Sequence, residues 1–315
     1  MSELRQAIDQ YLALRRSLGF ELREPENVLR RFVAFAEREG AAYITTDLVL
    51  RWTSEPSKAQ PATWASWVAI VRRFARWWSA TDPRTEAPPE GLLSHRLRRQ
   101  HPYIYSDDEI ERLVRAAAQL PSANGMRALT YSTYFGLVAA TGMRMSEGLA
   151  LDRSDVDRDQ GILTIRRTKF GKSRLVPLHA SACEALESYA AQRDRILRRV
   201  ETPAFFLSDG GRRITQWSTR YNFARVSQQI GLRPPAGGHR HGHGPRLHDL
   251  RHRFAVRTLI EWYRTGLDVE REIPKLATYL GHVHVNDTYW YLEAVPELLQ
   301  LATERLMQQR QEEPS

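Results

Sequence analysis

Three residues near position 250 have the types and spacing of a phosphate-handling site. In the segment RLHDLRHRFA, His248, Arg251 and His252 lie at i, i+3 and i+4, so a helix would place all three on one face. A guanidinium binds phosphate oxygens in a bidentate manner, and an imidazole transfers protons near neutral pH. Together these side chains predict chemistry at a phosphodiester.

Further candidates are spread over the second half of the chain. The whole set combines guanidinium, ammonium, imidazole and phenol groups, and it contains no carboxylate pair that could hold magnesium. Such a site could stabilise pentacovalent phosphorus with fixed cations in place of metal ions, while His or Lys manages the protons of the nucleophile and the leaving group. The predicted catalytic residues are Arg144, Lys169, His248, Arg251, His282 and Tyr291.

The composition favours a nucleic-acid partner. Lys and Arg together number 46 against 37 Asp and Glu, a net charge of +9, and such an excess attracts polyanions. The single Cys183 excludes an internal disulfide and favours a reducing compartment. No apolar run approaches the roughly 20 residues that span a bilayer. We therefore expect a cytoplasmic protein that binds double-stranded DNA without membrane contact.

The length of 315 residues favours two domains, and the first 82 residues are predicted to form a helical one. Four segments within residues 2–80 have apolar residues at helical spacing, which suits a small bundle. Residues 83–104 are rich in Pro and charge and are predicted to be a linker. The last helical segment has a basic face, which is either solvated or in contact with the DNA backbone, at Arg72, Arg73 and Arg76.

Residues 105–315 are predicted to form an α+β domain, in a chain that is mainly helical with a small antiparallel sheet. In TGMRMSE, Thr141 and Gly142 are predicted to form a turn that leaves Arg144 at the head of the next helix, where Glu147 could simply be its ionic partner. In GILTIRRTKFGKSRLVPL, apolar and polar positions alternate on both sides of FGK. This alternation predicts a β-hairpin with Lys169 near its tip.

The order of these motifs resembles that of the tyrosine recombinase (phage integrase) family. The resemblance rests on TGMRMSE, TKFGKSRLVPL, HDLRH, LGH and the tyrosine that follows, and it spans roughly residues 104–295. The N-terminal part is similar to the family's core-binding domain in size and helix content. The resemblance implies a site-specific recombinase, such as the integrase of a mobile element, that cuts and rejoins DNA through a 3′-phosphotyrosyl link without metal or ATP.

The resemblance also implies a role for each catalytic candidate. Tyr291 would attack the scissile phosphate, Lys169 would protonate the departing 5′-oxygen, and His248 would assist in accepting the tyrosine proton. The predicted ligands of the phosphate oxygens are Arg144, Arg251 and His282.

Two pairs of neighbouring residues compete for roles in this site. The interval that the family shows after the LGH histidine favours Tyr291 over Tyr289 as the nucleophile. Lys169 aligns with the family's hairpin lysine better than Lys172 does. His252 is expected to support the site by extending the helix face. Lys172 and Arg174 join the arginines of the first domain as predicted DNA contacts.

The expected assembly is a tetramer on two DNA sites, with other recombinases as further candidate partners. The segment PELLQLATERLMQQR has an apolar helical stripe that either packs on its own domain or passes to a neighbouring protomer. We expect neither a cofactor nor a metal, and residues 236–244 are interpreted as a flexible His-rich loop in preference to a zinc site. A type IB topoisomerase and a noncatalytic DNA-binding accessory are the alternative functions.

Overall fold

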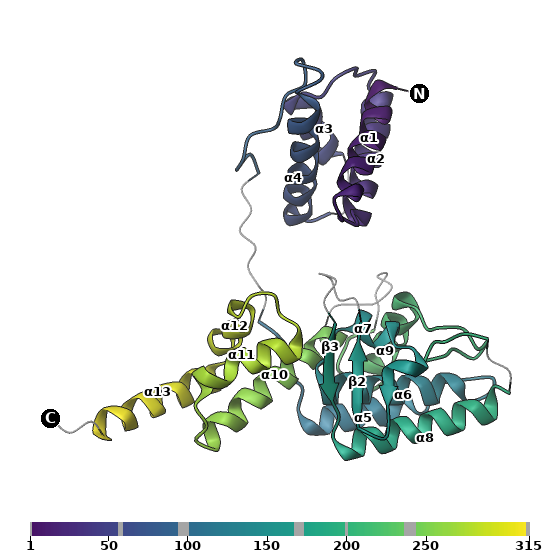
Figure 1. Cartoon of the computed structure of the whole chain (residues 1–315), viewed down its shortest axis with the longest axis vertical. Helices are drawn as coiled ribbons and strands as arrows, with labels where there is room; N and C mark the ends of the chain where they lie inside the picture. Colours follow the sequence, from purple (N-terminus) through teal and green to yellow (C-terminus); the bar gives the residue numbers. More distant parts are fainter. Residues whose placement is uncertain are drawn as a thin grey trace. The chain divides into compact units, whose positions relative to one another are not determined.

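The computed structural model describes residues 2–55, 59–93, 101–166, 173–198, 201–235 and 244–312. The chain divides into two compact units, Met1–Gln100 and His101–Ser315 (Figure 1). Each unit has its own buried core. In the described part of the chain, no helix has both the length and the apolar character to cross a membrane.

The first unit is a bundle of four helices around an aromatic core, as predicted. Phe32, Trp52 and Trp67 follow one another with ring centroids 5.3 and 5.5 Å apart. Pro61 opens the last helix at a position where its missing N–H costs no hydrogen bond. The helices are α1 (Glu3–Ser17), α2 (Arg23–Arg38), α3 (Thr46–Ser54) and α4 (Pro61–Trp78).

The start of the predicted linker packs on this bundle. The Glu86 backbone N–H donates to the Ile44 carbonyl at 2.8 Å, and the Glu86 carboxylate accepts a 2.8 Å bond from the Thr46 N–H at the start of α3. Arg72 donates to the carbonyls of Pro88 and Pro89 at 2.6 and 2.7 Å. A segment rich in Pro and charge has no periodicity, so the sequence does not reveal such packing.

The second unit combines helices with a three-stranded antiparallel sheet, and the predicted fold class is confirmed. Helix α6 is central, since it packs against α5, α8 and α10, and its Tyr134 and Phe135 are fully buried. The elements are α5 (Asp107–Ala117), α6 (Met126–Thr141), α7 (Met145–Ala150), a 3-10 turn (Arg153–Asp155), β1 (Val156–Asp157), β2 (Ile162–Ile165), β3 (Arg174–Pro177), α8 (Ala180–Ile196), α9 (Gln216–Gln229), α10 (Leu247–Arg264), α11 (Val269–Leu280), α12 (Asn286–Ala294) and α13 (Pro296–Glu312).

The hairpin predicted around FGK supplies two of the three strands. β2 and β3 pair in antiparallel register, with Ile162 opposite Pro177 and Ile165 opposite Arg174. Leu163 and Val176 point into the core, as the alternation of apolar residues requires. The hairpin tip at residues 167–172, with Lys169 and Lys172, lies outside the described residues.

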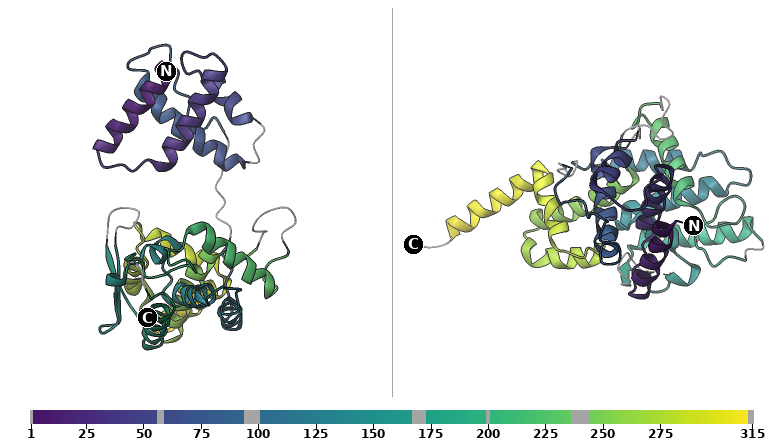
Figure 2. Two further views of the ribbon diagram at one scale, coloured as in Figure 1. Left: turned by 90° about the vertical axis from the view of Figure 1, so that its right-hand side faces the viewer. Right: turned by 90° about the horizontal axis from the view of Figure 1, so that it is seen from above.

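The sequence did not predict α11, because Pro274 lies inside this helix. A proline in a helix interior removes one backbone hydrogen bond and usually marks a break. Burial compensates here, since Ile273, Leu276 and Leu280 pack into a small core with α10 and α12. After α12 the chain continues as α13, which extends away from the rest of its unit (Figure 2).

Candidate active site

Three arginines converge on the C-terminal end of α11. The last carbonyls of a helix lack partners within the helix and carry partial negative charge, so they suit cations. The predicted catalytic His282 is the second residue after this end. Each guanidinium donates a 2.7 Å hydrogen bond to a different carbonyl: Arg174 Nε to Tyr279, Arg251 Nη2 to Leu280 and Arg144 Nη2 to Gly281.

Arg144 stands at the head of α7, as the sequence predicted, and Glu147 is its ionic partner. The turn before α7 contains Gly142, whose φ of +61° suits glycine. The Glu147 carboxylate accepts from the backbone N–H of Arg144 at 2.9 Å and from its guanidinium at 2.8 Å. It also accepts two bonds from Arg174, at 3.0 and 2.7 Å. One carboxylate is thus shared by two guanidiniums.

Glu147 is ionised throughout the ordinary pH range. Burial alone would raise its pKa, but the hydrogen bonds and charge of Arg174, followed by those of Arg144, lower the pKa to about 2. The two arginines therefore face a full negative charge. Two guanidiniums and one carboxylate carry one net positive charge, which is left for a phosphate.

Arg251 is the least exposed of these arginines. Its side chain bridges the carbonyls of Gly142 and Leu280 at 2.9 and 2.7 Å, and only 2% of the residue is exposed. Burial, and then the nearby charge of Arg144, lower its pKa to about 10. Burial of this positive charge therefore destabilises the folded protein, because both of its carbonyl partners are neutral and do not fully replace the lost hydration.

The predicted nucleophile Tyr291 lies inside the unit and touches a histidine. It is 2% exposed, and its hydroxyl lies 3.1 Å from His252 Nδ1. Tyr289, by contrast, is 38% exposed. The tyrosine favoured by the sequence is therefore the one that belongs to the histidine–arginine cluster.

His252 and His282 flank Tyr291. The ring centroids of His252 and Tyr291 are 5.5 Å apart, and those of His282 and Tyr291 are 6.3 Å apart. His282 Nδ1 lies 2.7 Å from the Thr288 hydroxyl, which fixes the orientation of the ring. His248 contacts His252 edge-on at 4.7 Å. Five of the six predicted catalytic residues are therefore linked by direct contacts or by neighbouring positions in one cluster.

Both histidines beside Tyr291 are neutral at pH 7. Burial, and then the charge of His248, lower the pKa of His252 to about 3, while burial and then Arg251 lower the pKa of His282 to about 4. A neutral His252 can accept a hydrogen bond from the Tyr291 hydroxyl through Nδ1. Its low pKa makes it an orienting acceptor, and a phosphodiester nearby would raise that pKa.

Lowering the pH is expected to destabilise the second unit. In the unfolded chain His252 and His282 take up protons near pH 6.5, whereas in the folded chain they do so only near pH 3 and 4. Between about pH 4 and 6.5 the unfolded state binds more protons, so stability falls as the pH falls, by up to about 1.4 kcal/mol per pH unit for each histidine. Urea denaturation at several pH values measures this slope.

The matched variant for this measurement is His252→Asn, which removes one of the two titrating rings. Its stability should depend less steeply on pH than that of the wild type between pH 4 and 6.5. Equal slopes would show that His252 does not titrate as its burial requires.

A cationic concavity opens beside this cluster. It has a volume of about 550 Å³, and its walls come from the start of α7, from α9 and from the start of α10. A concavity with several guanidiniums in its lining matches a polyanion better than it matches an apolar ligand. Its positively charged or titratable lining residues are Arg144, Arg220, Arg233, Arg246 and His248.

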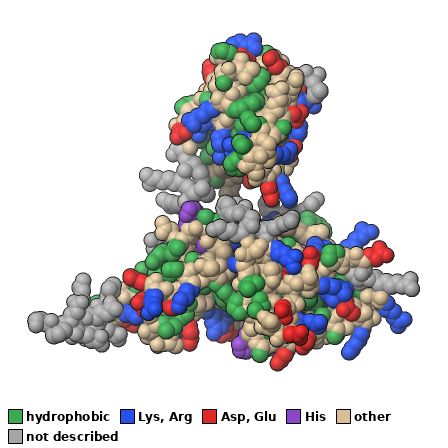
Figure 3. Space-filling model, in the orientation of Figure 1, with side chains coloured by type: hydrophobic (Ala, Val, Ile, Leu, Met, Phe, Trp, Pro, Cys, Tyr) green, Lys and Arg blue, Asp and Glu red, His purple; other side chains and the backbone are tan. Residues whose placement is uncertain are grey.

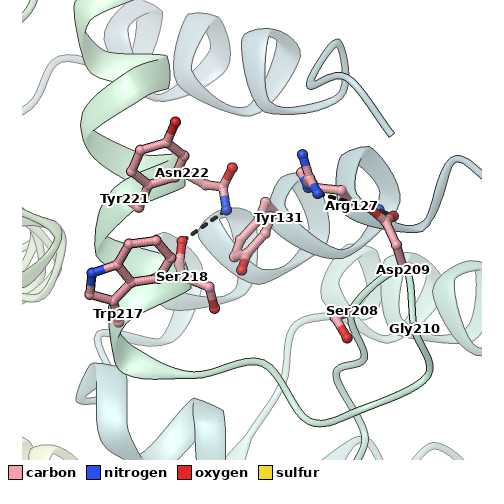
Figure 4. Close-up of a pocket in the computed structure, with 9 residues that line it drawn as sticks. All are labelled: Arg127, Tyr131, Ser208, Asp209, Gly210, Trp217, Ser218, Tyr221 and Asn222. Atoms are coloured by element: carbon pink, nitrogen blue, oxygen red, sulfur yellow. Dashed lines mark hydrogen bonds and ion pairs between the residues drawn. The ribbon is translucent and has the colours of Figure 1, made fainter. Parts of the chain in front are cut away.

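A second concavity, on the other flank of α9, has a different character (Figure 4). Its volume is about 340 Å³, and Trp217 and Tyr221 stack at its edge with ring centroids 5.5 Å apart. The cation here, Arg127, is paired with the Asp209 carboxylate at 3.0 Å. With its charge matched internally, this concavity is less suited to phosphate than the arginine-lined one.

The remaining predicted residues of the second unit either lie outside the described residues or, in the case of Arg174, have surroundings that the sequence did not suggest. Lys169, Lys172 and the His-rich segment at 236–243 lie outside the described residues. Arg174 is 10% exposed, and its guanidinium is hydrogen-bonded within the protein instead of facing solvent. Its DNA contact stays a prediction that these bonds disfavour.

The arginines predicted for DNA contact on α4 divide into two groups. Arg72 is half-buried and bound to the carbonyls of residues 88 and 89, whereas Arg73 and Arg76 are exposed. Arg76 pairs with Glu90 at 2.9 Å. Arg73 and Arg76 remain accessible for a DNA backbone, and Arg72 holds the end of the unit in place.

The sequence underrated His252 and Arg174. The sequence predicts only a supporting role for His252 on the helix face, yet His252 contacts the Tyr291 hydroxyl. Its i+4 spacing from His248 was the signal that could have placed it nearer the chemistry. For Arg174 there was no such signal, because its partner Glu147 is 27 residues away.

Known proteins resemble this chain over most of its length. The phage integrase family model matches residues 104–297. The protein y4rB of Sinorhizobium fredii, which is named as an integrase/recombinase, is 47% identical over 310 residues, 97% of this chain and 98% of that protein. Tyrosine recombinase XerD of Caulobacter vibrioides is 32% identical over 242 residues, 76% of this chain and 73% of that protein.

Solved structures share the fold. A lambda integrase (75–356) dimer bound to a COC′ core site has a TM-score of 0.60 at 19% identity, covering 90% of this chain and 96% of that one. The Tn1549 transposon integrase in complex with a circular intermediate DNA has a TM-score of 0.64 at 14% identity, covering 97% and 100%. With the family model matching more than half of its residues, this chain belongs to the phage integrase family and is a tyrosine recombinase.

Proposed function

We propose that this chain is a site-specific DNA recombinase of a mobile element that works through a 3′-phosphotyrosyl intermediate. The Tyr291 oxygen attacks the scissile phosphorus, a Tyr–O–P bond forms, and the bond to the 5′-oxygen breaks. Lys169 supplies the proton that the departing oxygen needs. Because one phosphodiester replaces another, the reaction needs no ATP, and the 5′-hydroxyl of a partner strand reverses it.

The observation that carries this proposal is the joining of the arginine cluster to the tyrosine. Arg144 and Arg251 bind adjacent carbonyls at the end of α11, and His282 follows directly and stacks beside Tyr291. The two guanidiniums supply the positive charge that stabilises a phosphorane in place of metal ions. His252 orients the phenol, and His248, whose ring contacts that of His252, assists in taking up the phenol's proton.

Burial of Tyr291 means that a segment must move before it can attack. The hydroxyl is enclosed in the core that α10, α11 and α12 share, while the arginine concavity is open. We propose that DNA binding or assembly shifts α12 and brings the phenol to the phosphate. Such a step keeps the nucleophile inactive on free protein.

Assembly on DNA gives α13 a function beyond its own unit. Leu298, at its start, is fully buried, but Leu299 and Met307 are 49% and 60% exposed. Exposed apolar residues on an extended helix suit a contact with a second copy. A related solved structure is a lambda integrase tetramer bound to a Holliday junction, and we propose the same tetrameric assembly here, with α13 passing to a neighbour.

The first unit is proposed to hold DNA by its backbone. On the face shown in Figure 3, basic and acidic side chains are interspersed over each unit, and that face carries no uniform basic patch. Contact is therefore expected from local groups such as Arg73 and Arg76, both exposed on α4. Phosphate contacts of this kind position the protein without reading sequence.

The test uses a nicked suicide substrate that carries the ends of the chain's own element. Wild-type protein should form a covalent DNA adduct without added metal or ATP, followed by joined recombinant strands when a partner duplex is supplied. Binding without an adduct would indicate a noncatalytic accessory protein. Relaxation of supercoils without dependence on DNA sequence would indicate a topoisomerase instead.

A further inference from the structure

Arg174 is built into the site as completely as the predicted catalytic arginines are. It lies on β3, its side chain is 10% exposed, and its Nε donates to the Tyr279 carbonyl at 2.7 Å. Both of its Nη groups bind Glu147, one to each carboxylate oxygen, at 3.0 and 2.7 Å. Such a bidentate pair fixes both partners in one plane.

The effect of this pair reaches Arg144 through the shared carboxylate. Glu147 Oε1 accepts from Arg144 Nη1 and Arg174 Nη1, and Oε2 accepts from Arg174 Nη2 and the Arg144 backbone N–H. The hydrogen bonds from Arg174 therefore engage both carboxylate oxygens of Glu147. Without them, Glu147 could accept bonds from both Nη groups of Arg144. Without Arg174, one carboxylate would face one guanidinium, and the positive charge available to a phosphate at Arg144 would be cancelled.

The same side chain joins three segments of the site. Its bonds connect β3, which follows the Lys169 segment in the sequence, with α7 and with the last turn of α11, which precedes His282. The packing around Gly281 is tight, since a Cβ there would lie 2.8 Å from Arg174 Nη1 and 3.3 Å from Arg144 Nη1. Only glycine allows both guanidiniums to approach the end of α11 this closely.

We propose that Arg174 is a positioning residue that holds Glu147 away from full pairing with Arg144 and so leaves the Arg144 guanidinium available and aligned for the scissile phosphate. This inference rests on the proposed function and deepens it. It replaces the expectation that Arg174 binds DNA directly. Arg174 acts on the phosphate only through its neighbours.

The first test is Arg174→Lys, which keeps the charge but loses the planar bidentate pair. We expect the rate of covalent adduct formation in single turnover to fall by about 10- to 100-fold, as for a misplaced catalytic group. The dissociation constant for uncleaved DNA should change by less than about 3-fold, and its salt dependence should not change. Arg153→Lys is the control, because Arg153 forms an exposed ion pair with Asp194 in the same unit.

A methylphosphonate at the scissile position separates positioning from a general loss of structure. This group lacks the negative charge of one nonbridging oxygen, so it depends less on Arg144. If Arg174 acts through Arg144, the defect of Arg174→Lys should shrink to less than about 3-fold on this substrate. An equal defect on both substrates would overturn the proposal in favour of a merely structural role.

Gly281→Ala gives a second route to the same displacement. Gly281 and Gly266 both have positive φ, +69° and +75°, but a Cβ on Gly266 meets no atom within 4 Å. Both alanine variants should lose similar stability from backbone strain, of about 1 kcal/mol. Only Gly281→Ala should also slow adduct formation on the phosphate substrate and recover on the methylphosphonate.

The outcomes distinguish this proposal from the proposed function. A wild-type chain that forms no adduct overturns both. A wild-type adduct together with a wild-type rate for Arg174→Lys overturns the positioning role alone. A variant that binds DNA more weakly, has a shallower salt dependence and cleaves bound DNA normally would show that Arg174 contacts DNA, as the sequence suggested.

Discussion

Tyr291→Phe is expected to abolish covalent adduct formation on a suicide substrate, leaving less than about one thousandth of the wild-type rate. The substitution removes only the attacking oxygen, and the ring keeps its place in the core between α10, α11 and α12. DNA binding should stay within about 3-fold of wild type, because phosphate contacts come from cations elsewhere. Denaturing gels and mobility shifts measure the two quantities.

Tyr289→Phe is the matched control, two residues away on the same helix. Tyr289 is 38% exposed and Tyr291 is 2% exposed. The control should form adducts at the wild-type rate. If Tyr289→Phe loses the adduct and Tyr291→Phe keeps it, the nucleophile is the exposed phenol, and the contact between His252 and Tyr291 serves packing only.

Loss of the Tyr291 hydroxyl also removes its contact with His252 Nδ1. A buried hydrogen bond between neutral groups contributes about 1 kcal/mol, so a small loss of stability in Tyr291→Phe is expected and does not explain a missing adduct. His252→Asn separates the two effects. It should slow the adduct without abolishing it, because it leaves the nucleophile in place but removes the acceptor that orients it.

The sequence predicted most of the fold because the elements carry local signals. Four amphipathic helices in the first unit, the hairpin strands and the turn before Arg144 are all fixed by the spacing of apolar residues or by glycine. Helix α11 was missed because Pro274 is a local break signal, whereas burial of Ile273 and Leu276 is a tertiary effect. The spacing of apolar residues alone does not show whether the proline or the burial determines the local structure.

The candidate site was predictable as a set of residue types, but its connections were not. His248, Arg251 and His252 share one turn of α10, so their proximity follows from spacing. The sharing of Glu147 by two arginines depends on tertiary structure, which brings Arg174 of β3 to a carboxylate 27 residues away in the sequence. An arginine in a hairpin strand looks the same in sequence whether it faces DNA or a carboxylate, so the sequence predicts for Arg174 the commoner role of an exposed cation.

Arg251→Met is expected to lower adduct formation by at least about 10³-fold while destabilising the folded protein by no more than about 3 kcal/mol. The substitution has two opposing effects on the free energy of unfolding. The substitution leaves the carbonyls of Gly142 and Leu280 without their donor, which costs about 1–3 kcal/mol each. It also removes a buried charge whose pKa is lowered to about 10, and this relief is worth about 3 kcal/mol. Chemical denaturation and single-turnover cleavage measure the two sides.

The contrast between these two measurements shows what the buried charge is for. A charge that served stability would cost the folded state about 3–5 kcal/mol when removed, as the loss of one partner of a buried ion pair does. A charge retained to bind a phosphate destabilises the free protein. It contributes favourably only when DNA is bound. Arg257→Met, on the same helix but exposed and paired with Asp107, should change neither quantity. Strong destabilisation of Arg251→Met, with normal cleavage by the folded fraction, would make Arg251 a structural bridge between α6 and α11 instead of a ligand of the phosphate.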